Sequence, residues 1–111
     1  MTDDLCEVII TAPDADWLAE FTRRLVDERL AASGHNISPI RSIYRWQGVI
    51  YDHAEARVAL HTRRSLVNTI IAETDREHPY EVPGLIALPI FDGNPAYLQW
   101  IRDVTRAPSE T

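Results

Sequence analysis

Residues 78–100 read HPYEVPGLIALPIFDGNPAYLQW, and this stretch says more about the fold than any other. Its prolines stiffen a loop that holds His78, Tyr80 and Glu81 at the start of an apolar strand, Leu85 to Ile90. The loop either presents three side chains that can bind a ligand or serves as a rigid connector. The motif is compatible with both interpretations, because proline-rich turns commonly do no more than route the chain.

The N-terminal part predicts one strand and one helix. Leu5 to Thr11 is an apolar run of strand length, and Pro13 follows it. Beyond it apolar residues recur every three or four positions, with Asp14 placed to cap the helix. We expect this helix to run to about Ala32, where Ser33-Gly34 would stop it.

The middle of the chain predicts a long hairpin. Ile37 to Trp46 and Val49 to Thr62 flank Gln47-Gly48, and two linking residues with glycine second are typical of a tight turn. At ~3.3 Å per residue, strands of this length outreach a domain whose radius of gyration is about 13 Å. The tip, with Trp46 and Tyr51, should therefore protrude and contact a partner.

The second half predicts two helices around a strand. Leu66 begins the apolar face of a helix that runs to about Glu77, before Pro79 stops it. Asn94 and Pro95 are a typical N-cap and first residue of a third, shorter helix. The resulting order is strand-helix-strand-strand-helix-strand (βαββαβ) plus a terminal helix.

This order predicts an α+β fold with an antiparallel sheet covered by helices on one face. At 111 residues the chain has room for a single domain, residues 1–111, with a core from about 5 to 106. The other sheet face would be bare. Self-association into a trimer would cover it.

Four motifs follow one another along the chain: Thr11-Ala12-Pro13, Leu30-Ala31-Ala32, Ser42 to Gly48 and residues 78–100. In their order and spacing the chain resembles the CutA family of divalent-cation tolerance proteins over nearly its whole length. The resemblance implies a ferredoxin-like α+β sandwich with a long hairpin between the second and third strands. It also implies a tight homotrimer and binding of divalent metal, chiefly copper, but no settled enzymatic activity.

Composition and charge exclude several functions. The net charge of −6 and pI of about 5.1 argue against nucleic acid as a partner, because phosphate binding relies on clustered cations. The chain has no lysine, which excludes Schiff-base chemistry. No apolar run reaches the ~20 residues of a membrane span. The acidic start, Met1 to Asp4, is unlike a secretory signal, and the single cysteine, Cys6, fits a reducing compartment, so we expect a cytoplasmic protein.

The CutA resemblance implies a metal-ligand set, and this chain keeps part of it. The position of the carboxylate ligand is Glu55, and the two positions before Pro79 are Glu77 and His78. Ile10 and Ser33 stand where the family often has cysteine. Because thiolate ligands favour cuprous ion, their loss predicts poor cuprous binding. The cofactor expected is at most a weakly held divalent ion, copper or zinc.

Aromatic residues near the hairpin turn suggest a cleft. Tyr44, Arg45 and Trp46 could line it with Tyr80 and Glu81 from the proline-rich loop, between subunits of a trimer. The alternative is that these aromatic side chains only pack an interface.

His53 and Glu55 share one face of their strand because they are two residues apart, and His61 lies further along that face. The three form a possible row of nitrogen and oxygen donors, and we include His61 among the cleft residues. The alternative is a solvated polar face with ion pairs through Arg57.

Two functions follow. The first is a homotrimeric metal-response protein that binds divalent cations in intersubunit clefts through His78, Glu55 and neighbouring carboxylates. The second is a metal-independent signalling or scaffold trimer, similar in fold to the nitrogen-signalling trimers. No nucleophile and base can be paired from the sequence, so we expect no enzyme. A partner protein cannot be named.

Overall fold

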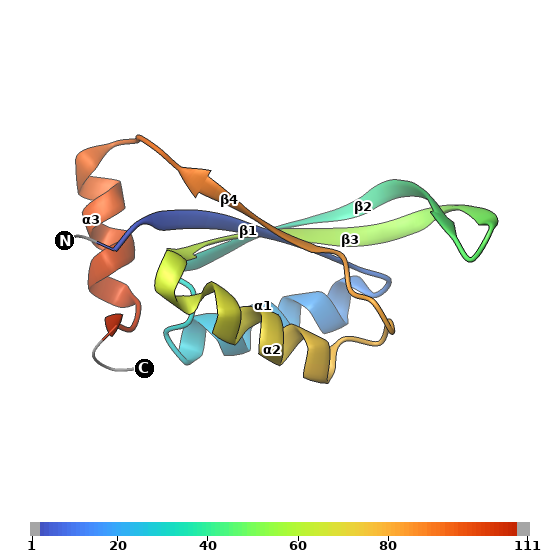
Figure 1. Cartoon of the computed structure of the whole chain (residues 1–111), viewed down its shortest axis with the longest axis horizontal. Helices are drawn as coiled ribbons and strands as arrows, with labels where there is room; N and C mark the ends of the chain where they lie inside the picture. Colours follow the sequence, from blue (N-terminus) through green and yellow to red (C-terminus); the bar gives the residue numbers. More distant parts are fainter. Residues whose placement is uncertain (1–2, 109–111) are drawn as a thin grey trace.

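The computed structural model describes residues 3–108, which form one sheet and three helices (Figure 1). The elements are β1 (Leu5–Ala12), α1 (Ala15–Asp27), β2 (Ser33–Trp46), β3 (Val49–Arg63), the 3-10 turn η1 (Arg64–Leu66), α2 (Val67–Glu77), β4 (Leu85–Ile90) and α3 (Pro95–Val104). The strands pair antiparallel in the order β2-β3-β1-β4. The predicted α+β fold, βαββαβ with a terminal helix, is confirmed.

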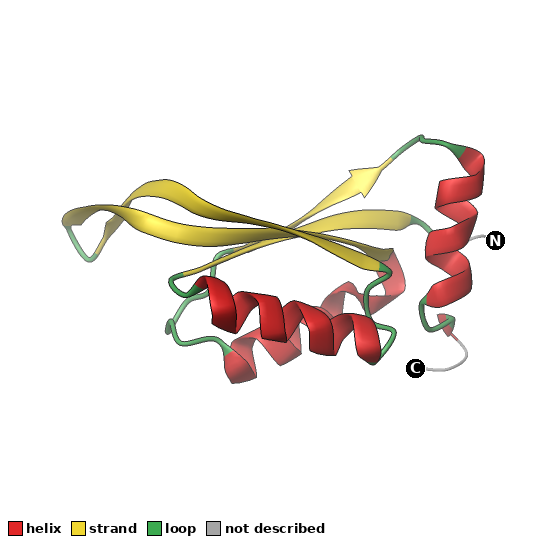
Figure 2. Ribbon diagram, turned by 180° about the vertical axis from the view of Figure 1, so that it is seen from behind, coloured by secondary structure: helices red, strands yellow, loops and turns green. Residues whose placement is uncertain are grey.

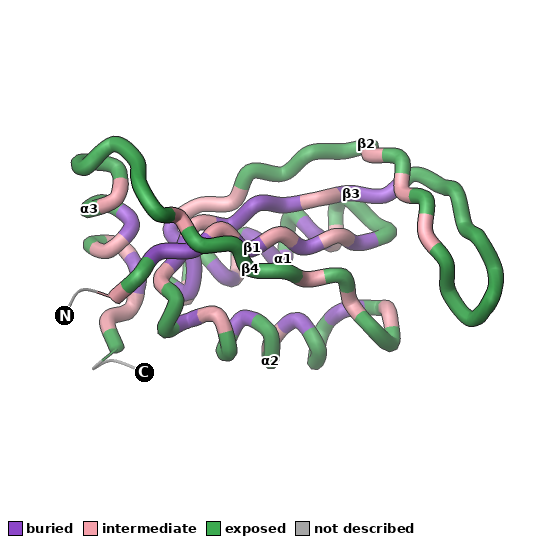
Figure 3. The backbone as a smooth tube through the Cα atoms, turned by 45° about the horizontal axis from the view of Figure 1, so that its top comes forward, coloured by how far each residue is buried: buried purple, intermediate pink, exposed green. Residues whose placement is uncertain are grey.

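The core lies between the sheet and two helices, α1 and α2, which cover the same face (Figure 2). Alternate residues of β1 and β3 point to these helices, so Val8, Ile10, Val58 and Leu60 are fully buried there together with Leu18 of α1. Figure 3 shows the same division along the chain, with buried segments concentrated beside the helices and an exposed hairpin. Burial of these side chains is the main source of the stability of this half.

α1 and α3 begin at the capping residues predicted from the sequence. The Asp14 carboxylate accepts hydrogen bonds from the amides of Asp16 (2.8 Å) and Trp17 (3.2 Å), which caps α1. The Asn94 side chain caps α3 in the same way, and Pro95 occupies its first position. Within residues 3–108 none of the helices has the length and apolar character needed to cross a membrane.

The predicted end of the first helix was wrong. α1 ends at Asp27 rather than near Ala32, and Ser33 begins β2 instead of stopping the helix. Arg29 causes the early end, because its φ of 62° is left-handed and turns the chain out of the helix. Glycine or asparagine usually marks such a turn in a sequence. An arginine at this position gives no indication that the helix ends there.

The hairpin of β2 and β3 extends far beyond the helices, as predicted (Figure 1). It contributes to a longest dimension of 45 Å, against 27 and 24 Å in the other directions. Gln47 (φ 49°) and Gly48 (φ 79°) form its turn, and two positive φ angles are typical of the tight hairpin turns that match strand twist. A register shift between Ile37 and Ile40 interrupts the pairing of β2 with β3 and marks the base of the protruding part.

The sheet face opposite α1 and α2 is largely uncovered. On β4, Ile86 is 56% and Leu88 is 43% exposed. α3 covers only one end of the molecule, where a small cluster of Leu5, Ala32 and Ile101 is buried. An apolar sheet face left open in this way is typical of a surface that binds another protein chain.

Candidate functional site

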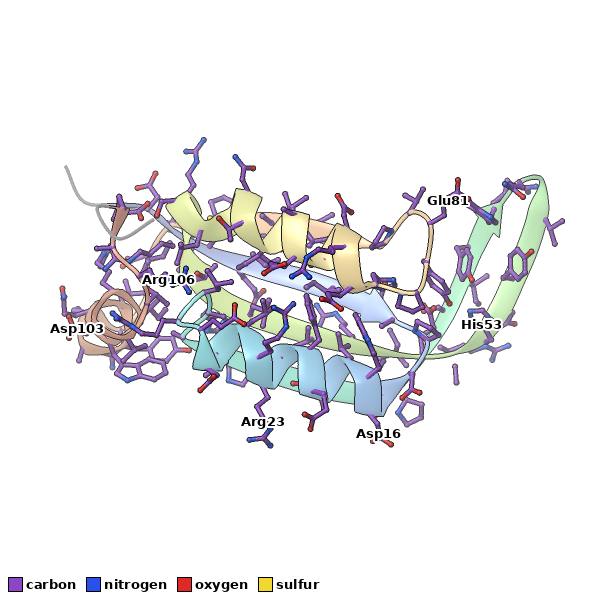
Figure 4. All side chains as sticks on the ribbon, turned by 90° about the horizontal axis from the view of Figure 1, so that it is seen from below. Asp16, Arg23, His53, Glu81, Asp103 and Arg106 are labelled. Carbon is purple, nitrogen blue, oxygen red and sulfur yellow. The ribbon has the colours of Figure 1, made fainter. Side chains whose placement is uncertain are left out.

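A pocket of about 770 Å³ opens between the protruding hairpin and the loop after α2. We call it the hairpin pocket. Figure 4 shows Glu81 on that loop beside the hairpin that carries His53. The lining residues are Thr11, Arg41, Ser42, Ile43, Tyr44, Trp46, Tyr51, His53, Glu55, Tyr80, Glu81, Val82 and Gly84. Its volume lies within the range of about 300–1,000 Å³ that is usual for small-molecule sites.

Five residues predicted as ligands lie together in this pocket: Tyr44, Trp46, Glu55, Tyr80 and Glu81. The first two come from β2, Glu55 from β3, and the other two from the loop that follows α2. The hairpin and the proline-rich loop thus form this pocket within one chain, whereas the sequence predicted a cleft between subunits of a trimer.

Glu55 is the buried acidic group of the pocket. Only 4% of its side chain is exposed, whereas Glu81 at the rim is exposed. The Tyr80 hydroxyl donates a 2.6 Å hydrogen bond to Oε2 of Glu55, and Nε2 of His53 lies 3.6 Å from the same oxygen. Oε1 accepts no hydrogen bond from any residue between 3 and 108. A buried carboxylate with one open oxygen is a strong acceptor for a cation or a hydrogen-bond donor.

Tyr80 stays protonated over a wide pH range. Burial raises the pKa of its phenol, and the hydrogen bond to Glu55 raises that pKa further. The hydroxyl is therefore a permanent donor to Glu55 at neutral pH. Tyr80 neutralises no charge, so the carboxylate keeps its affinity for a cation.

His78 holds the loop in place instead of facing the pocket. Its Nε2 lies 2.8 Å from the carbonyl oxygen of Thr11, and its Nδ1 lies 3.0 Å from the amide nitrogen of Tyr80. A carbonyl only accepts and an amide N–H only donates, so Nε2 carries the proton and Nδ1 is the acceptor. In this arrangement neither nitrogen offers a lone pair to a metal ion. His78 is 8% exposed and does not line the hairpin pocket, which differs from the predicted ligand position.

Glu77 also lies outside the pocket. Its carboxylate is 3.0 Å from Arg76 and 4.0 Å from Arg24, and Glu73 joins the same group of ion pairs. Hydrogen bonding to Arg76 lowers the pKa of Glu73. These arginines offset the acidic cluster at the C-terminal end of α2. The structure therefore does not place Glu77 beside Glu55 or at a common metal site with His78.

Aromatic rings form one wall of the pocket. The rings of Tyr44 and Tyr51 stack with centroids 5.4 Å apart, and the Tyr44 hydroxyl lies 3.1 Å from Nε2 of His53. The wall continues along β3. Its residues Tyr51, His53 and Glu55 are each two positions apart, and this spacing puts them on one face of the strand. The sequence predicted His53 and Glu55 as donors but did not predict that the ring of Tyr51 lies beside that of His53, with centroids 6.2 Å apart.

Arg41 was not predicted at this site. It lines the pocket, but its guanidinium makes two hydrogen bonds to Asp52, of 2.8 and 2.7 Å. This hydrogen bond lowers the pKa of Asp52. In the hairpin, Arg41 pairs with Ala54 and Ile43 pairs with Asp52. Arg41 and Asp52 are therefore diagonal neighbours on adjacent strands, close enough for an ion pair.

His61, predicted as a cleft residue, lies elsewhere. It shares the open sheet face with Glu55, but six residues along a strand are about 20 Å. Its Nε2 is 3.0 Å from Glu7 and its Nδ1 is 2.6 Å from the Tyr97 hydroxyl. The ring of His35 lies 5.3 Å away. His61 therefore belongs to a second polar cluster, near α3, and not to the hairpin pocket.

The expected cysteine position does not face the pocket. Ile10 is fully buried among the residues that contact the helices, whereas its neighbour Thr11 lines the pocket on the other face. Ser33 lies near Tyr97, and burial raises the pKa of the Cys6 thiol. Within residues 3–108 no group of three or more histidine, cysteine or acidic side chains is arranged to hold a metal ion.

Comparison with known proteins identifies the family. The family model described as CutA1 divalent ion tolerance protein matches residues 6–104. The chain is 39% identical over 102 residues to protein CutA of Mus musculus, which covers 92% of this chain and 58% of that protein. It therefore spans little more than half the length of that relative.

Two further relatives match over most of their own length. The divalent-cation tolerance protein CutA of Thermus thermophilus is 37% identical over 98 residues, 88% of this chain and 95% of its own. The crystal structure of CutA1 from Oryza sativa superimposes with a TM-score of 0.90 at 33% identity, covering 95% of this chain and 96% of that one. The fold and the pocket-forming loop and hairpin thus belong to a known architecture.

Proposed function

Because the chain belongs to the CutA1 divalent ion tolerance family, we propose that it is a homotrimer that binds a divalent cation, copper or zinc, at Glu55. The observation that carries this proposal is the burial of the Glu55 carboxylate with an imidazole, His53, beside it. The role is one in metal-ion tolerance, without a catalytic step. A cytoplasmic location remains a prediction from the sequence.

The donor chemistry supports a weak site. Imidazole nitrogen and carboxylate oxygen suit Cu²⁺ and Zn²⁺, whereas cuprous ion prefers the thiolates that this pocket lacks. One subunit supplies His53 and Glu55, with Nε2 and Oε2 3.6 Å apart. Water or a neighbouring subunit completes the coordination. Since a metal must displace a proton from imidazole, affinity falls as the pH is lowered.

The trimer is supported by surfaces that one subunit leaves open. Ile86 and Leu88 are exposed on the uncovered sheet face, and Val49 and Ile50 are 52% and 62% exposed beside the hairpin turn. Exposed apolar side chains on a sheet face and a protruding hairpin are typical of surfaces that bind another protein chain. A closed symmetric assembly would bury both regions.

A second candidate function is a metal-independent scaffold or signalling trimer. The observation that favours it is the engagement of two predicted ligands, since His78 is hydrogen-bonded at both nitrogens and Glu77 is paired with arginines. In that case the hairpin pocket would have an occupant other than a metal ion.

Calorimetric titration of Zn²⁺ and Cu²⁺ separates the two functions. Wild type should bind both ions, and Glu55→Gln and His53→Ala should each weaken binding at least about tenfold, as expected for loss of one of few ligands. Glu20→Gln, which removes an equal charge on the exposed face of α1, is the matched control and should bind as wild type does. Unchanged affinity in both pocket variants would favour the scaffold.

A further inference from the structure

The hairpin pocket carries a negative charge that its own residues do not neutralise. It contains the buried Glu55 and the exposed Glu81. Of the described lining residues, Arg41 alone has a permanent positive charge, and its guanidinium is held by Asp52, on the neighbouring strand. The pocket therefore attracts a cation and disfavours phosphate or carboxylate ligands.

Only one of the two oxygens of the buried Glu55 carboxylate is approached by a hydrogen-bonding side chain. Tyr80 and His53 both approach Oε2 of Glu55, which leaves Oε1 without a hydrogen bond from residues 3–108. Only 4% of the Glu55 side chain is exposed, so a hydrogen bond donated to Oε1 would lie in less polar surroundings than one at the open surface and would be stronger for it. An N–H of a cationic group is the strongest donor of this kind.

The remaining walls suit an apolar body next to that cation. Tyr44, Tyr51 and Trp46 present aromatic rings, and Ile43 and Val82 add aliphatic surface. Aromatic ring faces attract ammonium groups within about 6 Å, most strongly where water is excluded. A hydrated metal ion gains nothing from such walls, since it is compact and has no apolar part. The volume of about 770 Å³ also exceeds what one ion requires.

We propose that the hairpin pocket is a binding site for a small organic ammonium ion, a primary amine with an aliphatic or aromatic body. The ammonium donates to Oε1 of Glu55 and the body lies against the tyrosine and tryptophan rings. This inference goes beyond the metal proposal, because it uses Glu55 without needing His53 as a ligand. The chain has no lysine, so no lysine side chain of a second copy can supply this ammonium group.

The test is an NMR titration of the full-length chain, in its native assembly and with a chelator present, using phenethylammonium as probe. Phenethyl alcohol, which has the same body without the charge, is the control ligand. Phenethylammonium should shift the resonances of residues that line the hairpin pocket and bind at least about tenfold more tightly than the alcohol, the factor expected for a charged hydrogen bond. Equal affinities of amine and alcohol would overturn the proposal.

Variants assign the binding to the pocket. Glu55→Gln should remove the preference for the amine, and Tyr51→Leu should weaken amine binding about fivefold or more, whereas Tyr51→Phe keeps the ring and the affinity. Because Tyr51 lies on the exposed hairpin, these two variants stay informative even if Glu55→Gln fails to fold. His53→Ala should lower zinc affinity by a larger factor than amine affinity, since His53 is a proposed metal ligand but only a wall of the amine site, and this separates the two proposals. Amine binding that survives Glu55→Gln and Tyr51→Leu would overturn it.

Discussion

The same two strands, β2 and β3, pass through two very different regions. Beside α1 and α2, β3 places Val58 and Leu60 in a core from which water is excluded. Beyond the helices, the same pair of strands exposes Ile43 and Ile50. The covered half is therefore stabilised by its own packing. The hairpin arm has apolar surface and a charged pocket without an internal use, so function is to be sought there.

The largest expected effect is in the covered half. Leu60→Ala should lower the free energy of unfolding by about 2–5 kcal/mol, because it removes buried methyl groups and leaves a cavity. Leu60→Met conserves volume and should cost less than about 1.5 kcal/mol. Urea denaturation measures both. A loss in Leu60→Ala as small as in Leu60→Met would mean that this half is loosely packed, and the contrast between the regions would disappear.

Trp46→Ala tests the arm. If Trp46 anchors a neighbouring subunit, its truncation should weaken assembly by about 2 kcal/mol or more, while Trp46→Phe should retain most of the contact. Sedimentation equilibrium gives the dissociation constants. The thermal stability of Trp46→Ala should also depend more on protein concentration than that of wild type. An unchanged dissociation constant would show that this residue is no anchor.

Tyr80→Phe probes the junction of the two regions. Loss of the hydrogen bond to buried Glu55 should cost about 1–3 kcal/mol of unfolding free energy at neutral pH. Since burial and Glu55 raise the pKa of Tyr80 above its ordinary value of 10.0, wild type keeps this contribution below pH 10 and loses it as the pH rises further.

Chemical denaturation across that alkaline range measures the effect. The difference between wild type and Tyr80→Phe should shrink as the pH rises above 10, and Tyr51→Phe serves as the tyrosine control. A difference that stays constant with pH would contradict the assignment of the raised pKa to this hydrogen bond.

The smallest effect concerns the start of α1. Asp14→Ala should lower stability by about 1 kcal/mol through loss of the N-cap, whereas Asp16→Ala, which keeps the cap, should cost no more than about half of that. Thermal unfolding of the two variants makes the comparison. Equal losses would mean that helix-dipole interactions, and not the cap, stabilise this end of the covered half.

Local chemistry made most of the fold predictable. Asp14 and Asn94 act within three residues of themselves, so their capping roles are visible in the sequence. Val58 and Leu60 are two residues apart on β3 and share its buried face, as the two-residue period of a strand requires. The end of α1 could not be predicted, because Arg29 takes a left-handed conformation that residues of its type rarely adopt.

The candidate site was less predictable because its contacts are not local. His78 bonds to the carbonyl oxygen of Thr11, 67 residues away, and that backbone partner decides that its ring holds the loop. His61 lies on the same face of β3 as Glu55, because the two are an even number of residues apart. A shared face does not bring two residues close together when they are far apart along the strand. The hydrogen bond between Tyr80 and Glu55 joins the loop to the hairpin within one chain, whereas the sequence predicted that these two segments meet between subunits.

Native mass spectrometry of the 111-residue chain, with and without added Zn²⁺, tests the claim that the protein is a trimer that binds a divalent cation at Glu55. The proposal predicts a trimeric mass for wild type that increases by up to one zinc ion per subunit. Glu55→Gln should keep the trimeric mass and lose the zinc, while Glu20→Gln should keep both. A monomeric wild type, or a Glu55→Gln trimer that binds zinc as well as wild type does, would contradict the claim.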